Sequence, residues 1–578
     1  MKIIDMIPPE LLDAMNRFSR DLEWARRLPI YEIHKWWARR YSGVIRLLLA
    51  FNELDNKLLK KVDNFYAFVR DVYFNPPRVR DKKLLDPFCG GGTIIIEGAK
   101  LGYEAYGIEI NKLPYLILRA LKELPQIDLK IIENKIIQIS NNIKGIWATK
   151  CKKGHDALII HTFLAWRDRK GRLQIKFNKL KDGKKKVYFC EKCKKIYIHE
   201  SDLKNCIYCN NEFEKSYDKI EYVDLVPYAI EYFCDFCNER AFKIITHQDE
   251  ERFNTKSPFK YHLLQIPHLN ETARLLRAGL RYFDQLLTPR QLLTFQKVLN
   301  SFTREPYKTI VKLLVSDSLR SCSLLAYYSA RYNKVIPGFV IKSYWLPPQP
   351  VELNPLSYQI SSSGKLLPLG RGNIISSFRK FKRAKEFIKD QQILLNFKIH
   401  HGPAQEILPK LNDTFDLVFT DPPYGDYQFY SDLSLFSLSV IHEMDSNYLK
   451  KLLEKEIVFR KRKETLKYKK ELYLVFSSVL DKLSKNGKII ITFHHPNINV
   501  LYEVLDVFKN LSLKLHAIYP VIGESSGQLV KRRVYLDLVF IFGKEKKKPY
   551  YTITSLTYTK YDDQLQNSIE KLIDYYEV

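Results

Sequence analysis

The chain has 578 residues, too many for one ordinary domain, and its hydrophobic share of 46% is enough for substantial cores. No apolar run reaches membrane-spanning length and the N-terminus lacks a signal-peptide pattern, so we expect a cytoplasmic protein with no membrane partner. The formal charge of +29 favours a nucleic-acid partner, although a lysine-rich, heat-adapted proteome gives the same balance.

The first informative element is a predicted strand, turn and helix. The turn is Asp86-Pro87-Phe88-Cys89-Gly90-Gly91-Gly92-Thr93, which follows the apolar run 83–85 and opens a helical stretch, Thr93 to Lys100. A glycine-rich turn between a strand and a helix lets a cofactor approach the backbone closely, although such glycines also form plain turns. The next predicted strand, Tyr106 to Ile110, carries Glu109 near its end, where a carboxylate suits a ribose diol.

The residues around these glycines indicate which cofactor to expect. They do not match the G-x-G-x-x-G fingerprint of dinucleotide sites, and Asp86 would repel a pyrophosphate. The same carboxylate can bind an ammonium group, and S-adenosylmethionine has an ammonium, a sulfonium and no phosphate. We therefore predict that S-adenosylmethionine is the cofactor, bound by Asp86, Phe88, Gly90, Gly92, Thr93 and Glu109, with Trp37 as a candidate wall at its methionine end.

The strand and helix alternation begins near Lys82, stops near Leu124 and resumes near Ile393. Between these points lie eight of the nine cysteines, and four of them form two C-x2-C knuckles, Cys190/Cys193 and Cys206/Cys209. This spacing is typical of a zinc ribbon in which four thiolates close a tetrahedron around a structural ion.

A second metal site is a weaker prediction from the remaining cysteines. Cys234 and Cys237 form a third knuckle with no obvious partner, and Cys151 with His155 resembles a knuckle in which histidine replaces the second thiol. These four residues could form a Cys3His site. Cys322 lies in an apolar stretch and is expected in a core.

The second informative segment is Thr420-Asp421-Pro422-Pro423-Tyr424-Gly425, which follows the predicted strand Phe415 to Thr420. Methyl transfer to an amino group conjugated with a base is difficult because its lone pair is delocalised. The Asp421 side chain and the Pro422 carbonyl can accept hydrogen bonds from both N–H groups, which draws the nitrogen toward sp3. Tyr424 is expected to stack on the base. A surface turn is the alternative for a proline pair. The predicted catalytic residues are Asp421, Pro422, Pro423 and Tyr424, and a duplex substrate implies base flipping.

The fold class is predicted from all of these elements together. Later strands are expected at Leu394–His400, Lys488–Phe493, Leu511–Tyr519 and Val534–Phe542, with helices at Leu472–Leu483 and Val500–Lys509. We predict an α/β, Rossmann-like, seven-stranded class I methyltransferase domain with an antiparallel final pair and a large zinc-ribbon and helical insertion.

We predict that the chain is divided into five parts. They are the first methyltransferase part with the cofactor motifs (1–145), a zinc-ribbon insertion (146–255), a mainly helical insertion with a possible target-recognition role (256–375), the second methyltransferase part (376–545) and an appended tail (546–578). A Ser/Gly-rich stretch, 361–372, is expected to be the linker out of the insertion.

Taken with further segments, these motifs resemble the adenine-specific DNA methylases that contain a zinc ribbon. The segments are 33–40 (IHKWWARR), 287–293 (LTPRQLL), 344–355 with Glu352 and Asn354, 424–434, 492–496 (TFHHP) and 519–524. The resemblance implies S-adenosylmethionine-dependent methylation of adenine N6 in DNA, in a modification or defence setting with partner proteins. The chain departs from related methylases at Pro403, where a polar or acidic side chain usually meets the adenine of the cofactor.

Two other functions fit parts of the sequence. The two motifs also resemble the tRNA guanine-N2 methyltransferases, which methylate an exocyclic amine of RNA. A non-catalytic DNA-binding subunit of a defence complex is a third hypothesis, against which the intact Asp421 and Tyr424 argue.

Overall fold

The structure of the protein is a computed structural model. It describes residues 1–25, 27–37, 39–167, 173–174, 179–182, 185–190, 192–201, 203–212, 224–255, 262–329, 332, 334–339, 344–423, 425–426, 428–493, 495, 498–522, 537–552 and 570–576. Tyr424, Tyr427 and parts of the basic flanks of the cysteine knuckles lie outside the described residues.

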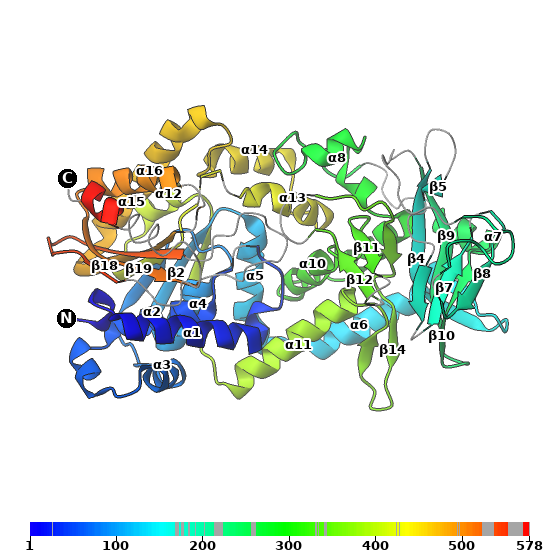
Figure 1. Ribbon diagram of the computed structural model, residues 1–578, viewed down its shortest axis with the longest axis horizontal. Helices are drawn as coiled ribbons and strands as arrows, with labels where there is room; N and C mark the ends of the chain where they lie inside the picture. Colours follow the sequence, from blue (N-terminus) through cyan, green and yellow to red (C-terminus); the bar gives the residue numbers. More distant parts are fainter. Residues whose placement is uncertain are drawn as a thin grey trace.

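An eight-stranded mixed sheet forms one end of the molecule (Figure 1). Its first five strands run parallel, and the sixth is antiparallel to both of its neighbours. In spatial order the strands are β16 (Phe397–His401), β2 (Glu104–Glu109), β1 (Lys83–Asp86), β17 (Phe415–Thr420), β18 (Leu483–Phe493), β20 (Asp537–Gly543), β19 (Lys514–Val521) and β21 (Tyr550–Tyr551). This mixed α/β sheet fits the predicted Rossmann-like fold, with one strand more than the expected seven.

The strands of this sheet are apolar on both faces because helices cover both sides (Figure 1). Along β17, Leu417 and Phe419 join one core, whereas Val418 between them joins the other. The first core is shared with α1 (Pro9–Ala25), α2 (Ser42–Glu53), α4 (Thr93–Leu101) and α5 (Lys112–Glu123). The second is shared with α15 (Thr465–Lys482) and α16 (Ile498–Asn510).

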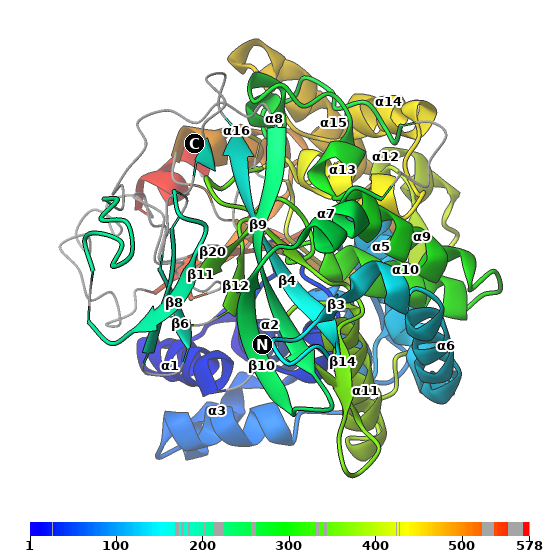
Figure 2. The same cartoon turned by 90° about the vertical axis from the view of Figure 1, so that its right-hand side faces the viewer.

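A second sheet, of six strands, lies at the opposite end of the molecule (Figures 1 and 2). Its strands are β10 (Glu239–Ile244), β9 (Asp224–Cys234), β4 (Asp156–Arg167) and β13 (Val351–Leu353), with β3 (Ala148–Lys150) and β5 (Leu173–Gln174) beside β4. Because β13 pairs with β4, the two predicted insertion segments 146–255 and 256–375 share one sheet.

Helices connect the two sheets. Of these, α10 (Tyr307–Ser318) contacts α5, α9 (Pro289–Asn300) and α11 (Ile374–Asp390). Segment 256–375, predicted to be mainly helical, also contributes five short strands. The other helices are α3 (Phe65–Phe74), α6 (Leu129–Asn142), α7 (His247–Phe253), α8 (Ala273–Arg277), α12 (Ala404–Ile407), α13 (Tyr430–Val440) and α14 (Ser446–Lys455). The other strands are β6 (Lys179–Asp182), β7 (Lys185–Phe189), β8 (Ile196–His199), β11 (Ala326–Ser329), β12 (Lys334–Pro337), β14 (Tyr358–Ile360) and β15 (Leu366–Pro368).

Two sequence-based expectations about segments are wrong. The Ser/Gly-rich stretch is not a free linker, because Ser361 and Gly364 form the turn of the β14–β15 hairpin. The tail is not merely appended, because β21 pairs with β19 and Leu572 is fully buried in the second core. The Ser/Gly-rich stretch is ordered by local hairpin pairing, whereas long-range contacts order the tail. Among the helices of the described chain, none is long and apolar enough to cross a membrane.

Candidate functional site

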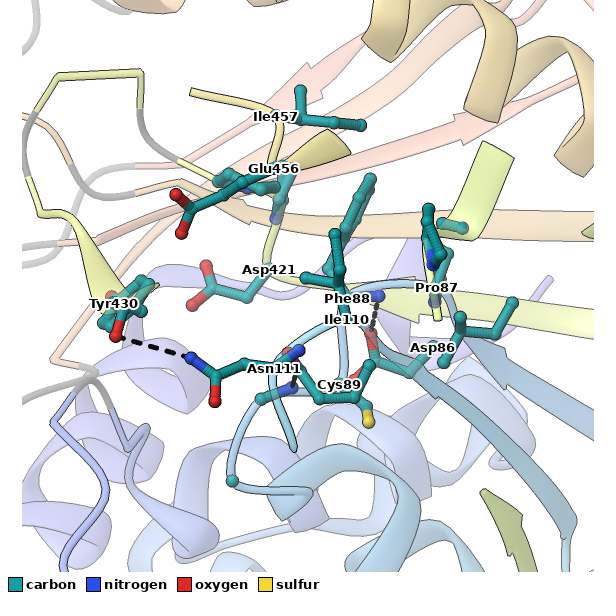
Figure 3. A pocket seen from close by; sticks show the side chains of 18 of the residues that line it. Asp86, Pro87, Phe88, Cys89, Ile110, Asn111, Asp421, Tyr430, Glu456 and Ile457 are labelled. Carbon is teal, nitrogen blue, oxygen red and sulfur yellow. Dashed lines mark hydrogen bonds between the residues drawn. The ribbon is translucent and has the colours of Figure 1, made fainter. Parts of the chain in front are cut away.

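A pocket lies at the carboxyl ends of β1, β2 and β17, where ligands bind in open α/β sheets (Figure 3). Because β1 pairs in parallel with β17, the turn after β1 and the segment after β17 meet at the same edge. The pocket is lined by Trp36, Arg40, residues 86–94, Ile108, Glu109, Ile110, Asn111, residues 402–405, Asp421, Pro422, Pro423, Tyr430 and residues 455–458. Of the predicted site residues that the structure describes, only Trp37 and the metal ligands lie outside this lining.

The glycine turn is shaped by backbone conformations that other residues avoid. Gly90 has φ +44° and Gly92 has φ +76°, both in the left-handed region. A Cβ atom on Gly92 would lie 2.2 Å from a methyl carbon of Leu118, so a side chain there is also excluded by packing. Gly92 is the N-cap of α4, which begins at Thr93. The turn therefore brings backbone N–H groups and a helix N-terminus to the pocket, as the motif predicts.

Glu109 is held at the end of β2 by backbone donors. Its Oε2 accepts a hydrogen bond from the Gly90 N–H at 2.8 Å, and its Oε1 accepts one from the Asn111 N–H at 2.7 Å. The residue is 8% exposed, and burial raises the pKa of its carboxyl group to about 7. The acid predicted to meet a ribose thus also connects the glycine turn to β2.

Asp86 lies deeper, at the end of β1. Its Oδ1 accepts hydrogen bonds from the Phe88 N–H at 3.1 Å and from the Thr420 hydroxyl at 2.7 Å, which connects β1 to β17. Burial raises the pKa of Asp86 to about 8, and the nearby carboxylates of Asp421 and Glu109 add to the shift. Phe88 lines the pocket and packs against Phe476 of α15.

Asp421 follows β17 and points to the same side of the pocket as Glu456 (Figure 3). Its carboxylate forms a two-pronged ion pair with the guanidinium of Arg40, with Nε–Oδ2 and Nη2–Oδ1 both at 2.9 Å. The Thr492 hydroxyl donates a third hydrogen bond to Oδ1 at 2.7 Å. Pro422 and Pro423 also line the pocket, and the buried Tyr468 hydroxyl donates to the Pro423 carbonyl at 2.7 Å. The predicted stacking residue Tyr424 lies outside the described residues.

Two aromatic side chains form a wall beside the glycine turn. The rings of Trp36 and Tyr430 stack with their centroids 5.5 Å apart, and both line the pocket. Trp37, predicted as this wall, instead packs edge-on against Trp36 and Phe339 away from the lining. Adjacent residues here point in different directions, which the Trp-Trp sequence leaves open. Pro403 lies in the lining with Gly402 and Ala404.

Several residues that line this pocket or contact its lining were not predicted from the sequence. Arg40 and Thr492 lie within segments that were used only for the family resemblance. Glu456 follows α14, and its Oε2 accepts a hydrogen bond from the Ser431 hydroxyl at 2.6 Å. The Asn111 amide donates to the Ser434 hydroxyl at 2.8 Å, so the segment 430–434 supports the pocket from behind.

The structure brings the two predicted C-x2-C knuckles together. The ligand atoms of Cys190, Cys193, Cys206 and Cys209 all lie within 4.8 Å of one another, and the thiols are free. The Cys190–Cys209 and Cys193–Cys206 sulfur distances are 3.5 and 3.7 Å. A tetrahedral site with zinc–sulfur bonds of about 2.3 Å has sulfur–sulfur edges of about 3.8 Å. The four thiols therefore fit a closed zinc site.

The second set also comes together, from the β3–β4 turn and the β9–β10 turn. Cys151, His155, Cys234 and Cys237 place their ligand atoms within 4.8 Å of one another. The Nδ1 atom of His155 lies 3.7 Å from the Cys151 sulfur and 3.2 Å from the Cys237 sulfur. The third knuckle thus lies beside Cys151 and His155, with Nδ1 as the histidine atom that faces the thiols.

Comparison with known proteins identifies part of the chain. Residues 78–147, which contain the glycine turn and Glu109, match the family model described as UPF0020, RMKL-like, methyltransferase domain. The chain therefore carries a methyltransferase domain. No curated protein matches the chain in sequence.

Several solved structures are similar to the chain. TrmN from Thermus thermophilus has 14% identity and a TM-score of 0.16 over 29% of this chain and 34% of that one. A precorrin 8w decarboxylase from Methanobacterium thermoautotrophicum has 13% identity and a TM-score of 0.15 over 28% of this chain and 63% of that one. A protein described as a modification subunit of a type I restriction enzyme, from Vibrio vulnificus YJ016, has 11% identity and a TM-score of 0.16 over 36% of this chain and 39% of that one. The chain spans less than two thirds of the length of each of these structures.

Proposed function

We propose that the protein is an S-adenosylmethionine-dependent methyltransferase that acts on the N6 amine of adenine in DNA. One observation carries the chemical part of this proposal. Asp421, the predicted acceptor for the target amine, lines the same pocket as the glycine turn and Glu109, the predicted cofactor residues. A surface turn at the proline pair would not place this carboxylate beside a cofactor site.

The residues around the pocket fit the proposed cofactor. Glu109 suits the ribose hydroxyls, and the carboxylate of Asp86 suits the ammonium group. Three lining carboxylates, those of Asp86, Glu109 and Glu456, suit a ligand with two cationic groups and no phosphate. At Gly90, a Cβ atom would lie 3.1 Å from the Trp36 indole nitrogen, so the bare backbone lets this turn pack closely against the aromatic wall. When bound, S-adenosylmethionine supplies an electrophilic methyl group.

The side chains of this chain then act on the amine rather than on the methyl group. Asp421 accepts a hydrogen bond from one N–H of the exocyclic amine, and the Pro422 carbonyl accepts one from the other N–H. The nitrogen lone pair is thereby freed from the ring. The hydrogen bond to Asp421 strengthens as positive charge develops on nitrogen, which is a preference for the transition state. Pro422 and Pro423 limit the motion of the segment, and the Tyr468 hydrogen bond fixes the Pro423 carbonyl.

Adenine in DNA is the proposed substrate on two grounds. The resemblance to zinc-ribbon adenine-specific DNA methylases covers both motifs and the cysteine knuckles, and the net charge of +29 favours a polyanion. Tyr424 is proposed to stack on the flipped base. We also propose two structural zinc ions, one in each four-residue set, and partner proteins of a DNA modification or defence system.

The test is methyl transfer with labelled cofactor to DNA and, in parallel, to tRNA, followed by analysis of the digested bases. Wild type should form N6-methyladenine in DNA. Asp421→Ala should still bind the cofactor but lose about a hundredfold or more in rate, as expected when a transition-state hydrogen bond is removed.

Asp413→Ala is the matched control, because Asp413 lies just before β17 and pairs with Lys83 outside the pocket. It should keep the wild-type rate. Product found only as methylguanine in tRNA would keep the pocket assignment and overturn the DNA assignment. An Asp421→Ala protein as fast as wild type would remove Asp421 from the site.

A further inference from the structure

Arg40 joins the proposed catalytic residue to a second buried carboxylate. It lies two residues before α2, and Tyr41 between them is the N-cap of that helix. Besides its two bonds to Asp421, its Nη1 donates to Oδ1 of Asp537 at 2.7 Å. The side chains of Arg40 and Asp537 are 4% and 2% exposed. The guanidinium thus lies between β17 and β20, which are not neighbours in the sheet.

The hydrogen bonds of Asp421 can be counted atom by atom. A carboxylate has about four lone-pair positions, two on each oxygen. Oδ1 accepts from Arg40 and from Thr492, which fills both of its positions. Oδ2 accepts from Arg40. Within the described part of the chain this leaves one position, and it is on Oδ2.

We propose that Arg40 is a positioning residue that orients Asp421 so that Oδ2 accepts the N–H of the target amine. This inference rests on the function proposed above. The planar fork of an arginine fixes the plane of a carboxylate through two parallel bonds, which a point charge does not. Arg40 also pairs with Asp537, so its guanidinium does not neutralise Asp421 alone, and the carboxylate can still attract a nitrogen that gains positive charge.

The other arrangement would have Arg40 occupy the place of the target amine and leave when the base enters. Its anchoring argues against this. Departure would separate the guanidinium from Asp421 and from Asp537, both poorly exposed, at the same time. The following residue also caps α2, whose residues Leu47, Leu48 and Phe51 are fully buried, so the main chain is held in place.

Chemical rescue tests the role of Arg40. Arg40→Ala should bind the cofactor within a fewfold of wild type but lose roughly a hundredfold in kcat. Added guanidinium or ethylguanidinium ion, at concentrations well below those that denature, should restore part of kcat with saturation. Arg40→Lys should recover less than the rescued variant, because an ammonium lacks the fork. Thr492→Val should lower kcat severalfold with KM unchanged.

Two controls separate positioning from folding and from function. Arg46→Ala removes another arginine, one that belongs to α2 and pairs with the buried Glu97 of α4 outside the pocket. The activity of this variant should not respond to guanidinium. The same ions should not rescue Asp421→Ala. The inference is overturned if Arg40→Ala is folded and binds the cofactor but shows no rescue. It is also overturned if this variant is faster than wild type. In both cases the proposed function would stand. If wild type methylates neither DNA nor tRNA, the proposed function fails and this inference fails with it.

Discussion

Besides Asp421, three carboxylates line the pocket, those of Asp86, Glu109 and Glu456, and burial raises the pKa of each of these three. The pKa is raised to about 8 for Asp86 and to about 7 for Glu109. A buried carboxylate near others is costly to ionise, so at pH 6 these two groups are mostly protonated in the free protein. A cationic ligand favours the ionised form, and its binding must release protons.

The affinity for S-adenosylmethionine should therefore rise with pH. Between pH 6 and 7.5 we expect an increase of about tenfold, which corresponds to roughly one proton released per ligand. The sign follows from the raised pKa values, since the acids lose their protons as the pH rises toward 7 and 8. The range stays below about 7.7, the lower end of the usual α-amino pKa, so more than half of the ligand's ammonium keeps its own proton. Calorimetry in two buffers of different ionisation enthalpy measures both the affinity and the proton release.

Glu109→Gln is the control for this pH dependence. It keeps an acceptor oxygen for the Gly90 N–H but cannot ionise, so the slope near pH 7 should become smaller. An affinity that is independent of pH in the wild type would mean that these carboxyls contact neither a cationic group nor a hydroxyl donor of the ligand.

At the residue scale, the sequence was sufficient for some site residues and insufficient for others. Asp86, Glu109 and Asp421 lie at or just after the ends of predicted strands, and strand ends in a parallel sheet lie at one edge, so their meeting is predictable. Arg40 is 381 positions from Asp421 along the chain and belongs to no strand. The hydrophobic periodicity of the sequence does not predict a contact between residues so far apart in the chain. The Trp36–Trp37 pair shows the same limit, since only the fold decides which ring faces the pocket.

At the scale of elements, α9 is tied to the six-stranded sheet by a buried ion pair. Arg290 of α9 donates from Nε to Oε1 of Glu352 on β13 at 2.8 Å, and a second bond joins Nη2 and Oε2. The Thr288 hydroxyl also donates to Glu352, and the guanidinium lies over the Trp147 ring, 4.4 Å from its centroid. Segments that resemble the methylase family thus include residues whose role here is to hold the insertion together.

Removal of one partner of this pair should destabilise the protein strongly. Glu352→Gln leaves the buried Arg290 charge without its counter-charge, and we expect a loss of about 3–5 kcal/mol in the free energy of unfolding. Denaturant unfolding followed by circular dichroism gives this value for the transition that includes the six-stranded sheet.

The matched control uses a pair at the surface. Glu133 pairs with Lys382, whose side chain is 38% exposed, so Glu133→Gln should cost at most about 1 kcal/mol. Equal effects of the two substitutions would mean that the buried pair contributes no more than an exposed one.

The element scale also explains where the predicted architecture failed. The strand Phe415–Thr420 has the predicted bounds because its apolar residues alternate between two cores. The Ser/Gly-rich stretch was misjudged because its residues form the turn of a local hairpin, and the tail because its order comes from partners elsewhere in the chain. Tyr576, for example, donates its hydroxyl to the Leu513 carbonyl at 2.6 Å. Local composition cannot indicate such a partner.

For the whole molecule, the two four-residue sets belong to the region of β7–β10, at the end opposite the eight-stranded sheet that carries the pocket (Figure 1). The set of Cys151, His155, Cys234 and Cys237 joins two turns of the six-stranded sheet, and the four thiols of the other set lie next to the sheet β6–β7–β8. A small cluster around Cys190 and Cys206 includes the buried ring of Tyr188. A core this small needs additional stabilisation, which a structural metal ion can give.

We therefore expect about two zinc ions per chain by elemental analysis. Cys209→Ala and Cys237→Ala should each reduce the content to about one, because each removes one of four ligands from a different set. Cys322→Ala is the control, since this buried cysteine lies in the main core, and the content should remain about two. Chelation should unfold the insertion while S-adenosylmethionine still binds, since the pocket residues belong to the other sheet. A metal-free protein with the full thermal stability of the wild type would show that neither set is a structural site.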